Sequence, residues 1–299
     1  MLQKFDERNR NLIININGQL VHRDKAGVSP FDSAVQGGDA VWEGLRLYNG
    51  RIFKLHEHLD RLERSARALS FAEIPLHEKI IDEIKRTLAA NKMSDGVHIR
   101  LTLTRGVKIT SGMDPRLNQN GPTLIILAEH KAPVYGKTGL TLATSKVRRP
   151  PRDVLDARIH HANLLNSILA KIEANNGGAD DALMLDTRGF VAETNATHIF
   201  IVRNSDLATS RVVACPEGIT RATVIEICAA EKIRCVETDL SVVDVYGANE
   251  IFCTGTMGEL AAVTKIDNRQ IGDGEVGPIT KRLSDLYAQR TASEGVQVA

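Results

Sequence analysis

The chain has 299 residues, 42% of them hydrophobic and 25% charged, which predicts a globular protein with a substantial core. The net charge of +1 excludes a general electrostatic attraction to nucleic acid or to membranes. No apolar run reaches the roughly 18 residues of a membrane span, and the charged first residues lack an apolar signal core, so we expect a cytoplasmic protein. The four cysteines have no CxxC pairing and are expected to be reduced, and no metal site is predicted.

The first part of the chain predicts strands followed by two helices. Asn49-Gly50 stands between apolar pairs and is a strong hairpin signal. Leu55 to Leu69 has helical apolar spacing, and so does Leu76 to Asn91. Val97 to Thr104 then alternates like a strand. Residues 106–121 have no period and many turn formers, which favours a loop near a site or between subunits.

Residues 131–139 contain Pro and two Gly and predict a linker between a smaller N-terminal domain, 1–133, and a larger C-terminal domain, 134–299. The arginines of the following segment, 148–152, are expected in a solvated loop. A helix with Asn163 as its N-cap comes next. Its apolar residues recur at helical spacing, with polar residues on the other side: Leu164, Leu165, Ile168, Leu169 and Ile172.

A hairpin after this helix brings the chain to Glu193, a carboxylate at the end of a strand among small residues, well placed to meet a ligand. Further on, Gly218 precedes a helix that Thr220 is expected to N-cap, and exposed N–H groups at a helix start suit a phosphate. The strand from Glu250 to Thr254 ends in a tight turn. Residues beyond Arg290 are expected to be frayed.

Several ordered segments resemble fold-type IV pyridoxal 5'-phosphate (PLP) enzymes, the group that includes branched-chain and D-amino-acid aminotransferases. The resemblance covers roughly residues 10 to 290. It implies a two-domain α/β fold in which the C-terminal domain is barrel-like. The matching segments are Gly38-Asp39-Ala40-Val41-Trp42-Glu43-Gly44, His58-Leu59-Asp60-Arg61-Leu62, Asn163-Leu164-Leu165, Ala170-Lys171-Ile172-Glu173-Ala174, Glu193-Thr194-Asn195-Ala196-Thr197-His198-Ile199-Phe200, Gly218-Ile219-Thr220-Arg221 and the turn Gly255-Thr256-Met257-Gly258-Glu259.

The resemblance also implies roles for individual residues. Glu193 would face the pyridine nitrogen of PLP, and the phosphate would be bound by Arg61, Ile219, Thr220 and Thr256. Arg100 and Met257 would contact the substrate. Without the resemblance, Arg61 would be read as a solvated helix residue, and Arg100 fits an edge-strand arginine facing water equally well.

The chain departs from this family where the family carries its Schiff-base lysine. His160 occupies that position, three residues before Asn163, and no lysine lies between Lys146 and Lys171. Gly37 and His198 also replace the usual tyrosine and asparagine. An imidazole cannot form a stable imine, but it can transfer protons, because its unperturbed pKa is about 6.5. A hydrogen-bonded histidine pair without chemistry is the alternative for His160 and His161.

Three functions are therefore open. The first is an aminotransferase with a His-based site, acting on a branched-chain or other small aliphatic amino acid and a 2-oxo acid. The second is another PLP reaction, such as racemisation, elimination or decarboxylation, with His160 as the base. The third is a non-catalytic PLP or pyridoxamine phosphate binder. Relatives complete each site with residues of a neighbouring copy, so we expect a homodimer or larger homo-oligomer, with contacts from residues 106–121.

Overall fold

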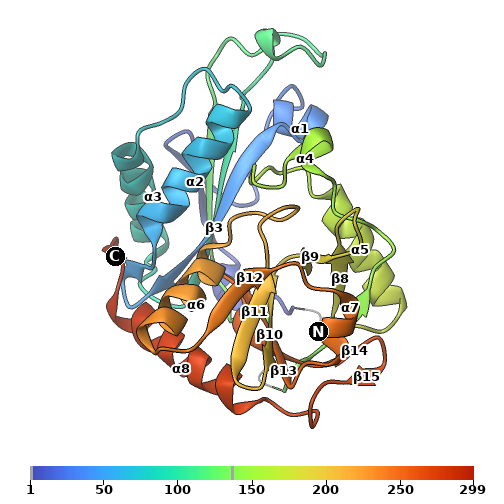
Figure 1. Ribbon diagram of the computed structural model, residues 1–299. Helices are drawn as coiled ribbons and strands as arrows, with labels where there is room; N and C mark the ends of the chain where they lie inside the picture. Colours follow the sequence, from blue (N-terminus) through green and yellow to red (C-terminus); the bar gives the residue numbers. More distant parts are fainter. Residues whose placement is uncertain (1–2, 136–137) are drawn as a thin grey trace. The chain divides into compact units, whose positions relative to one another are not determined.

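The structure is a computed structural model that describes residues 3–135 and 138–299 (Figure 1). It divides into two compact units. The N-terminal unit comprises residues 3–132 together with 159–163 and 291–299, and the C-terminal unit comprises 133–135, 138–158 and 164–290. The chain thus changes unit inside the expected linker. Residues 159–163 and 291–299 nevertheless belong to the N-terminal unit, so the two units cannot be separated by one boundary in the sequence.

The N-terminal unit is built on a seven-stranded sheet, within the described residues, whose neighbouring strands are all antiparallel. The strand order is β16-β4-β3-β5-β6-β1-β2. The strands are β1 (Ile13–Ile16), β2 (Gln19–His22), β3 (Ala40–Tyr48), β4 (Arg51–Ile52), β5 (Val97–Thr104), β6 (Thr123–His130) and β16 (Val296–Gln297). The hairpin at Asn49-Gly50 is confirmed, and both residues have the positive φ angles that a tight turn of this kind needs.

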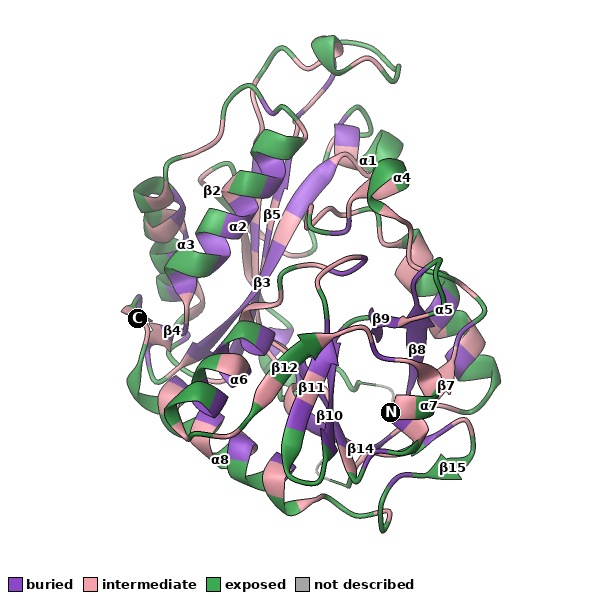
Figure 2. Ribbon diagram, in the orientation of Figure 1, coloured by how far each residue is buried: buried purple, intermediate pink, exposed green. Residues whose placement is uncertain are grey.

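Helices α2 and α3 cover one face of this sheet, and their purple, buried stripes point toward the strands in Figure 2. Leu59 and Leu62 of α2 pack with Leu45 and Ile99 of the sheet. Because side chains alternate along a strand, Trp42, Gly44 and Arg46 fall on the opposite face. The helical segments of the unit are η1 (Glu7–Asn9), α1 (Ser33–Gly37), α2 (Leu55–Ala68), α3 (His77–Asn91) and η2 (Pro115–Leu117).

The C-terminus is not frayed, contrary to the sequence prediction. Val296 and Gln297 form β16, which pairs antiparallel with β4. The backbone N–H of Val298 donates to the carbonyl of Gly50 at 2.9 Å. The strand is only two residues long, so it was below the length that a sequence pattern can reveal.

The C-terminal unit contains a nine-stranded mixed sheet in the described part of the chain, ordered β12-β11-β10-β13-β14-β7-β8-β9, with β15 paired to β14. Strand β9 also contacts β10 and β11, so the sheet curls back on itself. The strands are β7 (Leu140–Thr144), β8 (Asp181–Leu185), β9 (Val191–Thr194), β10 (His198–Arg203), β11 (Asp206–Ser210), β12 (Cys235–Thr238), β13 (Glu250–Gly255), β14 (Glu259–Ile266) and β15 (Arg269–Gln270). The barrel-like α/β fold expected for this part is confirmed.

The helices of this unit are α4 (Arg152–Leu155), α5 (Leu165–Asn176), α6 (Ile219–Ala230), α7 (Val242–Tyr246) and α8 (Pro278–Ser293). Two cap predictions were wrong. Asn163 does not cap α5, which begins after Leu164 without a side-chain cap. Thr220 lies inside the first turn of α6, whose N-cap is Gly218. In both cases the helix starts within one or two residues of the predicted position, but the polar side chain is not its cap.

Helix α5 packs on the sheet in an unexpected way. Its buried residues are the small Ala170 and Ala174, which contact Ala182 and Met184 of β8. The larger apolar residues face outward, with exposed fractions of 65% for Leu165, 49% for Ile168, 52% for Leu169 and 48% for Ile172. The sequence pattern identified the apolar stripe but not the side of the helix that packs on the sheet, because the small residues Ala170 and Ala174 form that contact.

Among the helices of residues 3–135 and 138–299, none combines the length and the apolar character needed to cross a lipid bilayer.

Candidate active site

The segment 159–163 lies beside the start of β3 as a short antiparallel extension of the N-terminal sheet. His161 and Val41 form a bridge. The N–H of Trp42 donates to the carbonyl of His160 at 3.0 Å, and the N–H of Ala162 donates to the carbonyl of Ala40 at 2.8 Å. The backbone ladder therefore places the side chains of His160 and Trp42 next to each other on one face.

The imidazole of His160 stacks on the indole of Trp42, with ring centroids 4.4 Å apart and an interplanar angle of 25°. Its Nδ1 lies 2.6 Å from the carbonyl oxygen of Trp42 and 3.3 Å from Oε1 of Glu43. The side chain is 16% exposed. Burial, and then the positive charge of Arg61, lower the pKa of His160 below its usual value, so the ring is neutral at pH 7.

Glu43 is a fully buried carboxylate at the centre of this group. Its Oε1 accepts from Nε of Arg61 at 2.8 Å, and its Oε2 accepts from Nη2 of Arg61 at 2.7 Å. Nδ1 of His58 lies 2.6 Å from Oε2. Burial raises the pKa of Glu43, but the positive charge of Arg61 outweighs it, and the pKa lies well below its usual value. Arg61 is thus a buried ion-pair partner, and the interpretation of it as a solvated helix residue is wrong.

Arg100 of β5 contacts the ring of Trp42. Its guanidinium carbon is 3.4 Å from the centroid of this ring, a close cation–π contact. Strand β5 lies between β3 and β6, so the alternative of an edge-strand arginine is wrong. Burial lowers the pKa of Arg100 to about 10, and the guanidinium stays charged at neutral pH.

In the C-terminal unit, Glu193 of β9 is also buried, with 5% of its surface exposed. Its Oε1 pairs with Nη2 of Arg149 at 2.5 Å. Arg149 further donates to the carbonyl of Ala214 at 3.2 Å and lies within hydrogen-bond distance of Asn166. Sequence reasoning placed Arg149 in a solvated loop, and this was wrong: the side chain is 13% exposed because it neutralises a buried carboxylate.

The start of α6 and the end of β13 meet at His198. His198 pairs with Thr254 across the sheet. A Cβ atom at Gly218, the N-cap of α6, would overlap the His198 ring, so the close approach requires glycine here. The turn that follows β13 contains Thr256 and Met257, both half-buried. His198 therefore lies beside both Gly218, which directly precedes Ile219 and Thr220, and the strand end that leads to Thr256.

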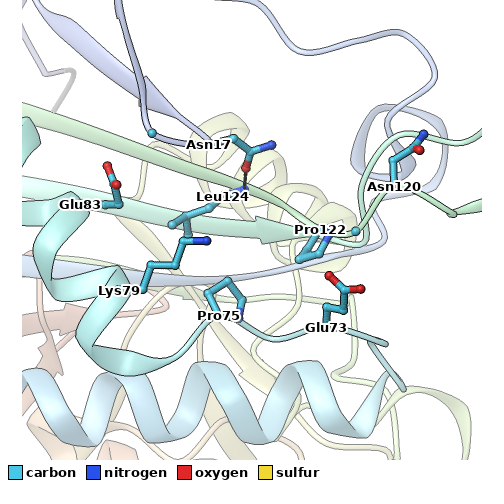
Figure 3. A pocket seen from close by; sticks show the side chains of 10 residues that line it. Asn17, Glu73, Pro75, Lys79, Glu83, Asn120, Pro122 and Leu124 are labelled. Atoms are coloured by element: carbon cyan, nitrogen blue, oxygen red, sulfur yellow. Dashed lines mark hydrogen bonds between the residues drawn. The ribbon is translucent and has the colours of Figure 1, made fainter.

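A separate cavity of about 250 Å³ lies in the N-terminal unit (Figure 3). Its polar lining includes Glu73, Lys79 and Glu83, and Asn17 accepts a hydrogen bond from the N–H of Leu124 at 2.7 Å along its wall. None of the site residues predicted from the sequence lines it.

The structure joins His160, Arg61 and Arg100 through two residues that sequence reasoning did not single out, Trp42 and Glu43. One signal was available. Glu43 is the only charged residue between Ala40 and Leu45, within a strand that is otherwise buried on the helix side. A carboxylate in that position needs a cation, and the next helix carries His58 and Arg61 one turn apart.

The model of the amino-transferase class IV family matches residues 40–266. The chain is 52% identical over 291 residues to branched-chain-amino-acid aminotransferase-like protein 2 of Arabidopsis thaliana, covering 97% of this chain and 52% of that protein. The chain therefore spans about half the length of this relative. It is 42% identical to a putative branched-chain-amino-acid aminotransferase of Methanocaldococcus jannaschii, covering 95% of this chain and 98% of that protein.

Solved structures with a similar fold include a T.th. branched-chain amino acid aminotransferase complexed with N-(5'-phosphopyridoxyl)-L-glutamate. It superposes with a TM-score of 0.88 at 32% identity and covers 94% of each chain. A branched-chain amino acid aminotransferase of Escherichia coli superposes with a TM-score of 0.89 at 26% identity over 96% of each chain. From the family match over most of its length, the chain belongs to the class IV aminotransferases.

Proposed function

We propose that this chain is a PLP-dependent transferase that moves an amino group between an amino acid and a 2-oxo acid, with branched-chain or other small aliphatic amino acids as substrates. The support is the family, together with the names of the relatives, which are branched-chain aminotransferases or similar to them. A solved relative holds a phosphopyridoxyl-glutamate ligand and another holds pyridoxamine 5'-phosphate, which supports PLP as the cofactor.

The residues of the C-terminal unit fit such a cofactor. Helix α6 has no side-chain cap, and the N–H groups of Ile219 and Thr220 have no acceptor among the described residues. An uncapped helix start binds a phosphate through these N–H groups and the helix dipole. Thr256 would add a hydroxyl from the neighbouring turn. Glu193 offers a buried carboxylate for the pyridine nitrogen, and Arg149 supplies its counter-charge.

In the N-terminal unit, Arg61 is the proposed further phosphate ligand, and Arg100 is the proposed ligand of the substrate carboxylate. Two guanidinium nitrogens of Arg61 already contact Glu43, so a phosphate would share this arginine with a carboxylate. Arg100 presents a charged guanidinium beside Trp42. A guanidinium suits both carboxylate and phosphate because its donors form a planar fork.

The proposal for the chemistry rests on His160, which stands where the family carries its Schiff-base lysine. PLP supplies an electron sink that makes the substrate α-proton acidic. A neutral imidazole can take up and return that proton, but it cannot hold the cofactor by a stable covalent bond. We therefore propose non-covalent cofactor binding, with His160 as the acid/base and Met257 beside the substrate.

The test combines trapping with turnover. The purified protein, loaded with PLP, is treated with sodium borohydride and examined by mass spectrometry. We expect no pyridoxyl adduct on any lysine and cofactor that remains extractable. The same preparation is assayed for transfer from leucine, isoleucine or valine to 2-oxoglutarate, with product analysis. A reduced adduct on a lysine, or absence of bound cofactor, would refute the proposal.

The geometry of His160 also favours a second candidate, a PLP reaction other than amino transfer. A neutral imidazole that takes up the substrate α-proton would suffice for racemisation or elimination, and in decarboxylation the protonated imidazole would supply the proton that replaces the lost carboxylate. Product analysis separates this candidate from the first, because the amino acid is then converted without 2-oxoglutarate. Bound cofactor with no turnover of any kind would indicate a non-catalytic binder.

A further inference from the structure

We infer that Glu43 and the main-chain carbonyl of Trp42 are positioning groups for His160, which hold its ring proton on Nδ1 and leave Nε2 as the atom that accepts a proton from a substrate. This inference depends on the proposed function for the identity of the substrate, but the state of the imidazole can be measured without it.

The main chain of His160 is fixed from two sides. Its carbonyl accepts from the N–H of Trp42 at 3.0 Å, and its own N–H donates to Oγ of Ser65 on α2 at 3.0 Å. The indole Nε1–H of Trp42 donates to the carbonyl of His161 at 3.0 Å. Strand, helix and indole thus hold the segment, and the ring has little freedom to turn away from β3.

The hydrogen bonds of Nδ1 determine the tautomer. A carbonyl oxygen can only accept, so the 2.6 Å contact with Trp42 requires a proton on Nδ1 of His160. The second neighbour, Oε1 of Glu43 at 3.3 Å, belongs to an ionised carboxylate and is also an acceptor. A neutral imidazole carries one proton. Nε2 is therefore the nitrogen with the free lone pair, and no donor approaches it among the described residues.

Glu43 is suited to remain ionised during proton transfer. Arg61 contacts both of its oxygens, His58 contacts Oε2, and His160 contacts Oε1. The four contacts correspond to the four lone-pair sites of a carboxylate. When Nε2 of His160 gains a proton, the imidazolium lies next to this negative charge, which stabilises it. Such a carboxylate orients the base and stabilises its charged form without taking the proton itself.

Apart from Glu43, the charged group that acts on the His160 ring in the described part of the chain is Arg61 of α2, and its charge opposes the imidazolium. His58 shares the carboxylate. Arg100 of β5 lies on the Trp42 ring, on which His160 also stacks. Among the described residues, Glu43 is the acidic residue that contacts His160. Removing its charge should therefore lower the pKa of this ring.

The experiment is ¹⁵N NMR of histidine side chains in the protein without added cofactor, over a pH series. His160→Gln assigns the signal among the nine histidines. In the unchanged protein we expect the neutral ring with Nδ1 protonated and Nε2 unprotonated. In Glu43→Gln we expect the pKa of His160 to fall, and in Glu43→Asp to stay nearer that of the unchanged protein. A purely structural role for Glu43 would not move this pKa while the fold is intact.

The matched control is Glu63→Gln on the same helix as Arg61. Glu63 pairs with Arg67 near the surface, so the pKa of His160 should not change. A proton on Nε2 in the unchanged protein overturns the inference even if Glu43→Gln does not fold. An unchanged pKa in folded Glu43→Gln also overturns it. Should the expected tautomer be found in a protein that binds no PLP, the proposed function fails and this placement of the proton stands.

Discussion

Arg149 and Glu193 form a buried ion pair in the C-terminal unit, with Nη2 and Oε1 2.5 Å apart and only 13% and 6% of their side chains exposed. The two residues are 44 positions apart in the sequence and come from a loop and from β9. Removing one member of such a pair leaves the other charge without a partner in a medium that solvates it poorly.

Arg149→Met should therefore lower the free energy of unfolding by about 3–5 kcal/mol, as measured by chemical denaturation. The double variant Arg149→Met with Glu193→Gln should recover part of this loss, because the orphaned charge is removed. Arg152→Met is the control. Arg152 is exposed and donates to the carbonyls of Val212 and Val213, so its loss should cost about 1 kcal/mol. Equal losses in the two single variants would contradict the assignment.

The buried side chain of His98 should make the free energy of unfolding depend on pH. Burial, followed by the charges of Lys131, Arg100 and Arg46, lowers the pKa of His98 to about 3. The unfolded chain, with a pKa of about 6.5, then binds more protons than the folded one between the two pKa values. The neutral ring contributes its full stabilisation above the pKa that His98 has in the unfolded chain. This stabilisation is lost as the pH falls toward the pKa that His98 has in the folded protein. The total loss is roughly 4–5 kcal/mol, because each unit of pKa difference corresponds to about 1.4 kcal/mol.

The check is the unfolding free energy of His98→Phe and of the unchanged protein at several pH values from about 3 to 7, the window set by the two pKa values. The variant should lose less stability on acidification, and other titrating groups cancel in the difference. His56→Phe, at an exposed position on α2, should behave like the unchanged protein. Parallel curves for His98→Phe and the unchanged protein would show that this ring is not buried in its neutral form.

Arg61→Ala should weaken PLP binding by roughly 1.5–3 kcal/mol, the range of a lost charge-assisted hydrogen bond. It should also reduce stability, because Glu43 loses two of its contacts. Affinity is therefore measured by absorbance titration under conditions where circular dichroism shows a folded protein. Arg67→Ala, on the exposed side of the same helix, should not change the affinity. A folded Arg61→Ala variant with unchanged affinity would remove Arg61 from the cofactor site.

Local patterns in the sequence predicted the elements of the fold well. Strand β5 runs from Val97 to Thr104, as its alternation predicts, and α2 spans Leu55–Ala68 within one residue of its predicted end. These elements are defined by periodicity and turn chemistry, which are properties of neighbouring residues. The strand β16 and the return of residues 159–163 to the N-terminal unit depend on pairing over long distances, which no local pattern contains.

In the candidate site, too, sequence motifs identified individual residues but not the contacts that depend on pairing over long distances. The family motifs pointed to Arg61, Glu193 and His160, but not to what holds each of them. The partners of Glu193 and His160, Arg149 and Trp42, are distant in the sequence and are brought close by sheet registers and by one loop. Charge balance was the usable signal: a buried carboxylate must have a cation, and this requirement predicts that a partner exists without naming it.

The exposed apolar face of α5, formed by Leu165, Ile168, Leu169 and Ile172, predicts association between copies of the chain. We expect a homodimer by light scattering at micromolar concentration. Ile168→Glu with Leu169→Glu should shift it to monomer, because burying two carboxylates at an interface is costly. Met113→Glu, at a 98% exposed position of the 106–121 loop, tests the loop as the contact instead. A monomeric unchanged protein would contradict both.

His160→Lys should allow covalent attachment of PLP. The ring of His160 is held by its Nδ1 against the carbonyl of Trp42, so the imidazole does not extend as far as a lysine side chain would. A lysine here keeps the backbone contacts with Trp42 and Ser65, since these involve only main-chain atoms of residue 160. The amine would lie near Arg61, whose charge favours the neutral, nucleophilic form of a lysine.

After borohydride treatment of the PLP-loaded variant, mass spectrometry should find a pyridoxyl group on residue 160, and the absorption spectrum should change accordingly. His161→Lys is the matched control, because the neighbouring side chain points to the other face of the strand-like segment and should give no adduct. Amino transfer need not appear in the variant, since Gly37 and His198 also differ from the family pattern. If His160→Lys folds and binds PLP without an adduct while His161→Lys gives one, the residue facing the cofactor is His161, and the role assigned to His160 is wrong.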